Sequence, residues 1–170
     1  MELISFYKQS FGSNKQVFKE ILSGLTADQY TWREESGKWN LLEIVCHLHD
    51  EEKEDFRARL VSVLTDPLQS FIPIDPVGWV TERKYSEQHF AEVLDKFLSE
   101  RQYSLNWLDS VSNANWDNTF QHPTIGAMSA KYIIANWLAH DYLHIRQIAR
   151  IKYKFLKNKS GLLLNYAGDW

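Results

Sequence analysis

His140 and His144 are four residues apart in a segment whose apolar residues follow a helical period. Residues four apart on an α-helix point the same way, so both imidazoles can bind one ion from a single helix. His47 lies far upstream in a second such segment, and it would complete a three-imidazole site if the two helices were neighbours. Three protein ligands with one open position are typical of catalytic zinc centres. The spacing therefore predicts a metal site made by His47, His140 and His144.

The other histidines are weaker candidates. His49 is the alternative to His47, because residues two apart point roughly 200° apart around a helix and cannot face the same ion. We favour His47 because it lies close to the apolar stripe that includes Ile44. His89 is expected to be solvated. His122 precedes the helix with the paired histidines, where it either lines the mouth of a pocket or is an ordinary loop residue.

Polar and aromatic residues near the histidines are candidates for a supporting role. The polar candidates are Asp50, Glu51, Asp141 and Gln147. Glu51 lies one turn after His47 on the same helix face, so it is the best placed general base or extra ligand. A solvated surface position is the alternative for each acid. The aromatic candidates for an apolar pocket wall, which are equally typical of a core, are Trp39, Trp79, Trp137 and Tyr142.

Composition limits the class of protein. The chain has 170 residues, a formal net charge of −3 and one cysteine, Cys46. The length fits one domain over residues 1–170, and the small negative charge gives no reason to expect binding to nucleic acid or to an anionic membrane. A lone cysteine cannot form an internal disulfide, and neither a signal peptide nor a membrane span is recognisable. We therefore expect a cytoplasmic protein in which Cys46 is a small buried hydrophobic residue.

The apolar periodicity predicts four long helices, at residues 3–25, 41–64, 86–108 and 129–155. Asn40 with Glu43 three residues later has the form of a capping box at the start of the second helix. Three prolines between residues 67 and 76 predict a long connection that crosses outside the helices. No alternation is long enough for a sheet, and the tail from Gly161 is apolar enough to pack on the body. The prediction is an all-α four-helix bundle, whose interior commonly carries metal sites.

Several segments resemble the DinB/YfiT-like superfamily. Residues 39–47, with the acids that follow them, are similar to the second-helix signature of that family. Residues 122–126 and 137–148 are similar to its fourth-helix signature, and residues 166–170 resemble tails seen there. The match runs in order along essentially the whole chain, and its specificity comes from the combination of segments.

The resemblance implies a four-helix bundle of mirror-variant up-and-down topology that holds a divalent metal, usually nickel or zinc, through three histidines. Carried over to this chain, those ligands are His47, His140 and His144. The family includes transferases and isomerases that depend on bacillithiol, mycothiol or glutathione, together with many proteins described as metal-dependent hydrolases. One scaffold serves several chemistries here, so the resemblance does not choose the reaction.

Two classes of function therefore stay open. The first is a metalloenzyme, either a metal-dependent hydrolase or an S-transferase that uses a low-molecular-weight thiol, with Glu51 as its candidate catalytic residue. Its partner would be a small electrophilic substrate, and a homodimer is left open. The second is a non-catalytic module whose fold is stabilised by the metal. Such a module would bind a small molecule or take part in a stress response.

Overall fold

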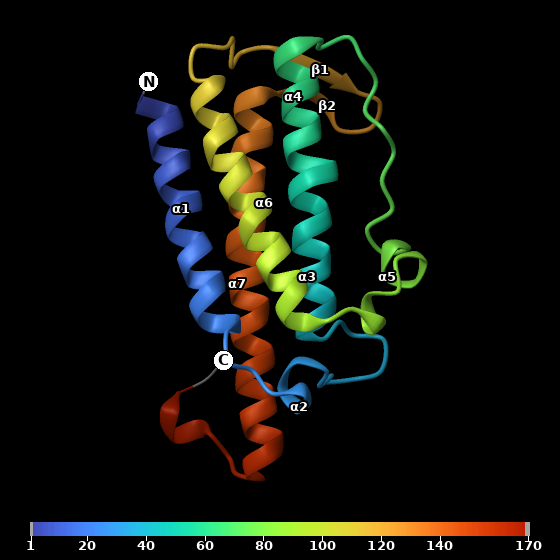
Figure 1. Cartoon of the computed structure of the whole chain (residues 1–170), viewed down its shortest axis with the longest axis vertical. Helices are drawn as coiled ribbons and strands as arrows, with labels where there is room; N and C mark the ends of the chain where they lie inside the picture. The colour runs from blue at the N-terminus through green and yellow to red at the C-terminus, as the bar shows by residue number, and fades with distance from the viewer. Residues whose placement is uncertain (1, 169–170) are drawn as a thin grey trace.

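Four long helices lie side by side in the computed structural model, which describes residues 2–168 (Figure 1). They are α1 (Glu2–Leu22), the continuous run of α3 (Leu41–Asp50), η1 (Glu51–Phe56) and α4 (Arg57–Thr65), α6 (Phe90–Ser110), and α7 (Ala130–Ser160). Four short helices join or follow them: α2 (Ala27–Tyr30), α5 (Trp79–Glu82), η2 (Tyr85–Glu87) and η3 (Asn165–Ala167). The predicted all-α four-helix bundle is confirmed.

The helices run in two directions. α1 and α7 are parallel neighbours, since Asn14 contacts Asp141 and, further along both helices, Lys152 donates to the carbonyl of Ile21. The run from α3 to α4 and α6 point the other way (Figure 1). The chain must therefore return between α4 and α6, and it does so through residues 66–78, which pass outside the bundle. α4 packs against α7, which brings the second and fourth long helices together as predicted.

Capping residues fix the two helices that carry the histidines. The Asn40 side chain accepts from the backbone N–H of Glu43 at 2.9 Å, and the Glu43 carboxylate accepts from the N–H of Asn40 at 3.0 Å. Arg33 also donates to the Glu43 carboxylate, at 2.6 Å through Nη2. The Ser129 hydroxyl caps the first turn of α7, and Gly161 ends this helix at a φ of 67°. Both helix starts therefore follow from local sequence, because each uses a favoured capping residue.

The second long helix contains a π-helical segment, η1, directly after the turn with His47. A π-helix has a wider turn than an α-helix and is frequent at functional sites. Within η1, Glu51, Glu52 and Asp55 are all buried, at 5%, 1% and 8% exposure. The apolar period predicted a continuous α-helix here. The wider turn was missed because periodicity carries no signal for it.

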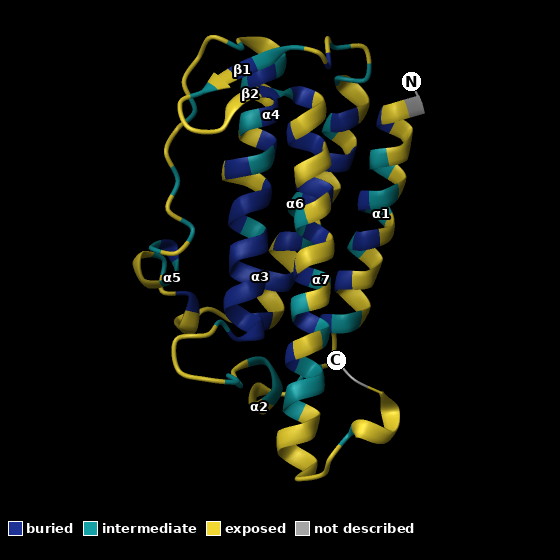
Figure 2. Cartoon of the chain, turned by 180° about the vertical axis from the view of Figure 1, so that it is seen from behind, coloured by how far each residue is buried: buried dark blue, intermediate teal, exposed yellow. Residues whose placement is uncertain are grey.

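Buried residues occur on every long helix (Figure 2), and the apolar ones form two clusters. The cluster at the α2 end of the bundle includes Phe18, Ile44, Phe97 and Ile148. The cluster at the opposite end includes Phe11, Leu60, Leu105 and Ile134. Between them lies a polar layer, by which we mean the buried side chains of Asn14, His47, Glu52, Arg101, Asp141 and His144. Every long helix contributes to this layer, which lies at the level of the histidines.

A short hairpin differs from the prediction that no sheet is present. β1 (Thr119–His122) and β2 (Gly126–Ser129) pair antiparallel just before α7. Phe120 stacks on Phe71 of the long connection, with ring centroids 4.0 Å apart. Strands of four residues are too short to show an alternating pattern, which explains why the prediction was wrong here.

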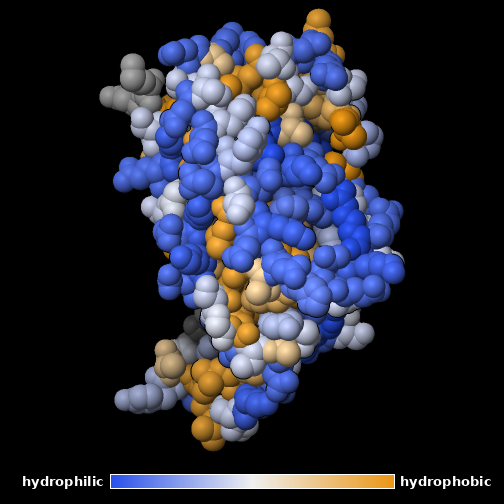
Figure 3. Space-filling view, viewed as in Figure 1, coloured by the Kyte–Doolittle hydropathy of each residue, from blue (hydrophilic) through white to orange (hydrophobic). Residues whose placement is uncertain are grey.

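The ends of two predicted elements also differ. α6 begins at Phe90 and not at Ser86, because residues 85–87 form the separate helix η2. The tail does not pack on the body within residues 161–168: Leu162 and Leu163 are 64% and 80% exposed, and residues 169–170 lie outside the described part. Figure 3 shows apolar side chains gathered at this end of the molecule. No helix within residues 2–168 is long and apolar enough to cross a membrane.

Candidate metal centre

Three imidazoles meet between α3 and α7. His140 Nε2 lies 3.2 Å from His47 Nε2 and 3.0 Å from His144 Nε2. The three residues can each offer one ring nitrogen within 4.8 Å of the others. Nitrogens bound to one ion at about 2.0–2.1 Å lie roughly 3.0 Å apart in octahedral and 3.4 Å apart in tetrahedral geometry. The structure thus brings together the three histidines that the spacing singled out, at a separation that fits one divalent ion.

Burial keeps these imidazoles neutral. His47 and His144 are buried, while His140 is partly exposed. Burial, aided by the charge of His144, lowers the pKa of His47 to about 3 and that of His140 to about 2, with His47 also acting on His140. Burial lowers the pKa of His144 to about 4, although a hydrogen bond with Gln147 and the charge of Asp141 oppose it. Neutral imidazoles keep the lone pairs that a metal ion needs.

The ring nitrogens of this cluster are better placed to bind one cation than to hydrogen-bond to one another. His140 Nε2 lies close to two other ring nitrogens, but with one hydrogen or one lone pair it can make a full hydrogen bond to only one of them. Buried polar atoms that face one another without donors lose solvation and gain little in return. One cation among the three Nε2 atoms would satisfy all three lone pairs together. The donor set therefore fits a divalent transition metal.

Aromatic rings surround the imidazoles. The Trp39 ring lies 4.8 Å from the His47 ring, and the Phe56 ring lies 5.0 Å from the His140 ring, measured between centroids. Phe56 also stacks parallel to Trp137 at 6.0 Å. Of the four aromatic residues proposed as a pocket wall, Trp39 and Trp137 are thus near the site. Phe56 was not singled out, because an aromatic residue at helical spacing gives no signal beyond that of a core position.

Glu51 is the acid beside this cluster. Its Oε1 lies 4.0 Å from His47 Nδ1, which is beyond hydrogen-bond distance. Its hydrogen bond is with Asp55, which in turn pairs with Arg59. Burial, followed by the hydrogen bond and the negative charge of Asp55, raises the pKa of Glu51 to about 8. The pKa of Asp55 is also raised, chiefly by burial. A carboxyl group whose pKa lies near neutral pH is suited to exchange a proton beside the imidazoles.

His49 points away from the cluster. Its Nδ1 lies 2.9 Å from Asp50 Oδ1. The same carboxylate accepts from the Tyr85 hydroxyl at 2.7 Å and pairs with Arg83 at 2.8 Å. Asp50, one of the candidate acids, is therefore engaged on the outer side of α3 and not with the imidazoles.

The remaining candidates lie outside the site. His122 Nδ1 accepts from two backbone N–H groups of the hairpin turn, so this residue shapes the turn. His89 is exposed and precedes α6. Trp79 packs under the guanidinium of Arg83, and Tyr142 is 53% exposed.

Cys46 is buried as expected, and burial raises its pKa to about 12, so it stays a thiol.

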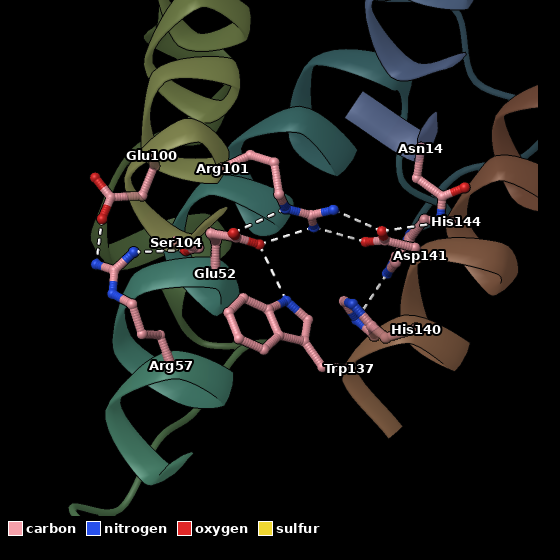
Figure 4. Close-up of polar contacts among 10 residues, drawn as sticks. All are labelled: Asn14, Glu52, Arg57, Glu100, Arg101, Ser104, Trp137, His140, Asp141 and His144. Carbon is pink, nitrogen blue, oxygen red and sulfur yellow. Dashed lines mark hydrogen bonds and ion pairs between the residues drawn. The ribbon is translucent and has the colours of Figure 1, made fainter. Parts of the chain in front are cut away.

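Arg101 is the residue that the sequence reading missed (Figure 4). It is 1% exposed and donates to both oxygens of Glu52 at 2.8 Å and to both oxygens of Asp141 at 2.6 and 2.7 Å. A signal was present in the sequence. Arg101 interrupts the apolar stripe of α6 between Phe97 and Leu105, and a charge at an interior position needs a buried partner.

Comparisons with known proteins agree with this fold. The family model of the DinB superfamily matches residues 11–148, which include all three histidines. Among solved structures, YfiT from Bacillus subtilis is similar, with a TM-score of 0.76 and 16% identity over 94% of this chain and 89% of that chain. That protein is described as a probable metal-dependent hydrolase with an unusual four-helix bundle topology. No curated protein matches the chain.

Proposed function

Because this chain belongs to the DinB superfamily, we propose that it is a divalent-metal-dependent hydrolase that acts on a small electrophilic substrate. His47, His140 and His144 hold the ion in this proposal. The observation that carries it is the convergence of their Nε2 atoms at 3.0 and 3.2 Å from a common member, His140. The description of the structural relative YfiT as a probable metal-dependent hydrolase supports the same reaction class.

Zinc or nickel is the proposed ion, because imidazole nitrogen suits both. Such an ion, held by neutral ligands that leave its charge in place, would make a water molecule acidic enough to serve as a nucleophile near neutral pH. The protein supplies the rest. The rings of Trp39 and Phe56 pack against those of His47 and His140 and form apolar walls beside the ligands. Glu51 is the proposed general base, because the positive charge of a bound ion would favour the ionised carboxylate that can accept a proton, against the burial that raises its pKa to about 8.

Thiol transfer is the alternative that the experiment must separate from hydrolysis. Cys46 cannot supply the sulfur, because it is buried and its pKa is raised to about 12. A thiol would therefore have to come from a low-molecular-weight cofactor. In either case we expect a small-molecule partner and a cytoplasmic location, with no role for nucleic acid or membrane; self-association into a homodimer is compatible with both.

Glu51→Gln tests the reaction class. An attacking water benefits from a base, whereas a metal-held thiolate needs none, so the loss of the base should slow hydrolysis by about 100-fold or more. The measurement is kcat/KM of metal-loaded protein on a panel of esters and amides, and on a generic electrophile with bacillithiol, mycothiol or glutathione. Glu54→Gln is the matched control, because Glu54 lies in the same η1 segment but pairs with Arg83 at the surface.

Hydrolysis, S-transfer and a non-catalytic module predict different outcomes. A large loss in Glu51→Gln with metal content and the Glu54→Gln rate unchanged supports hydrolysis. A small loss together with thiol-dependent turnover would replace hydrolysis by S-transfer. Metal-loaded protein that accelerates none of these reactions above the free ion would favour the non-catalytic binding module.

A further inference from the structure

The charged part of the polar layer is built around one residue, Arg101. Its guanidinium comes from α6 and lies between Glu52 of η1 and Asp141 of α7, as Figure 4 shows. All three side chains are 1% exposed. A buried ion pair is weak evidence for stability, because removing charges from water costs about as much as their attraction returns. A group of three buried charges therefore calls for a role other than stability.

The network joins the two helices that carry the imidazoles. Glu52 is five residues after His47, and it is tied to α7 at two points (Figure 4). One is the Trp137 indole, which donates to Glu52 Oε2 at 3.0 Å. The other is Asp141, reached through Arg101. These two points bracket His140 along α7. His140 is thus held between two fixed contacts on α7, and Glu52 links them to the helix that carries His47.

α1 completes the arrangement. Asn14 Nδ2 donates to Asp141 Oδ2 at 3.1 Å, so Asp141 is held by α1 and α6 together. Asp141 follows His140 directly and precedes His144 by three residues. Two carboxylates and one guanidinium also leave this buried layer with an excess of negative charge.

We propose that Arg101, Glu52 and Asp141 are positioning residues that hold His47, His140 and His144 at metal-binding distance. The inference rests on the proposed function, because it assumes a metal at the imidazoles. None of the three residues is a ligand in this proposal. They act as a second layer, which orients ligands and commonly changes metal affinity by about 10–100-fold when it is mutated.

The chain offers a matched control in Arg57 (Figure 4). This residue of α4 is also buried, pairs with Glu100 of α6 and donates to the Ser104 hydroxyl at 2.8 Å. It ties α4 to α6 in the same way, and the partners of its hydrogen bond and its ion pair both lie on α6. Glu100→Gln therefore removes one charge from a partly buried network without touching the turn that carries the paired histidines.

The test compares Zn²⁺ affinity in Asp141→Asn, Glu52→Gln and Glu100→Gln. The dissociation constant is measured by competition with a chromogenic chelator, at a temperature where circular dichroism shows each variant to be folded. The d–d absorption of bound Co²⁺ reports ligand geometry as a second readout. Asp141→Asn and Glu52→Gln should weaken Zn²⁺ binding by about 10–100-fold and alter the Co²⁺ spectrum, whereas Glu100→Gln should stay within about twofold of the wild type.

Three results would overturn the proposal. Folded Asp141→Asn and Glu52→Gln that bind Zn²⁺ as tightly as the wild type would show that the network acts only in stability. An equal loss in Glu100→Gln would show that any buried charge has the same effect. A wild-type protein that binds no metal would remove the proposed function and this inference together, which distinguishes that failure from the first two. If one network variant does not fold, the other decides.

Discussion

At the scale of single residues, type and spacing identified the imidazoles but not their support. His47 was preferred to His49 because it lies beside the apolar stripe. In the structure His47 contacts His140, whereas His49 contacts Asp50. Arg101 was missed because a charged residue in a helix is usually solvated, and its partners lie 49 and 40 residues away. Contacts over such separations depend on which helices are neighbours, and sequence spacing does not contain that information.

Burial of the imidazoles has a consequence for pH. An imidazole with its ordinary pKa of about 6.5 is mostly protonated at pH 5.5, and the protonated form cannot bind metal, so its apparent metal affinity falls. The pKa values of His47, His140 and His144 are lowered to about 3, 2 and 4. In the folded protein, protons therefore compete with the metal for these imidazoles only well below pH 5.5. We expect metal-loaded protein to keep its metal at pH 5.5 and to lose it as the pH falls towards 4.

The measurement is metal per chain after gel filtration at pH 7.0, 5.5 and 4.0, with circular dichroism to show that the protein is folded. Loss of metal from folded protein between pH 7.0 and 5.5 would contradict the account, because it would mean that the imidazoles titrate as exposed ones do. The same lowered pKa values decrease the free energy of unfolding of the metal-free protein in acid. Below about pH 6.5 these histidines bind protons in the unfolded chain but not in the folded protein.

At the scale of elements, the helix that begins at Leu41 was predictable at its start and not in its middle. Asn40 and Glu43 form the reciprocal hydrogen bonds that their spacing predicted. The η1 segment lies only two turns further along, and nothing in the local sequence announces its wider turn. Local capping chemistry is read from neighbouring residues. A π-turn that buries three acids depends on partners such as Arg101 in other helices.

Asn40→Ala should lower the free energy of unfolding by about 1 kcal/mol, because the first turn of α3 loses its side-chain cap. Urea denaturation of metal-free protein checks the value. Thr26→Ala is the control, since Thr26 stands at the N-cap position of the four-residue helix α2 without a side-chain capping hydrogen bond, and none of the residues of α2 is buried. A change of less than about 0.5 kcal/mol is expected there, as is usual for surface substitutions. Equal decreases in the free energy of unfolding in the two variants would show that the cap of α3 contributes no more to stability than a surface residue does.

At the scale of the whole molecule, four amphipathic helices and one proline-containing connection were enough to predict the bundle. The adjacency of α4 and α7 followed from the assumption of a shared site, and the structure supports it. The parallel direction of α3 and α6 could not be read from helix lengths. It follows from the path of residues 66–78 outside the bundle (Figure 1). The division of the core by a polar layer was also not predictable, because it requires all four helices to be aligned.

The central claim is that His47, His140 and His144 bind one divalent metal ion. It is tested most directly by metal analysis of protein purified without a nickel column and then incubated with Zn²⁺ or Ni²⁺ and freed of excess ion. We expect about one ion per chain in the wild type and in His49→Ala, and almost none in His140→Ala, because His140 is the member that lies within 3.2 Å of both others. Wild-type metal content in His140→Ala would contradict the account.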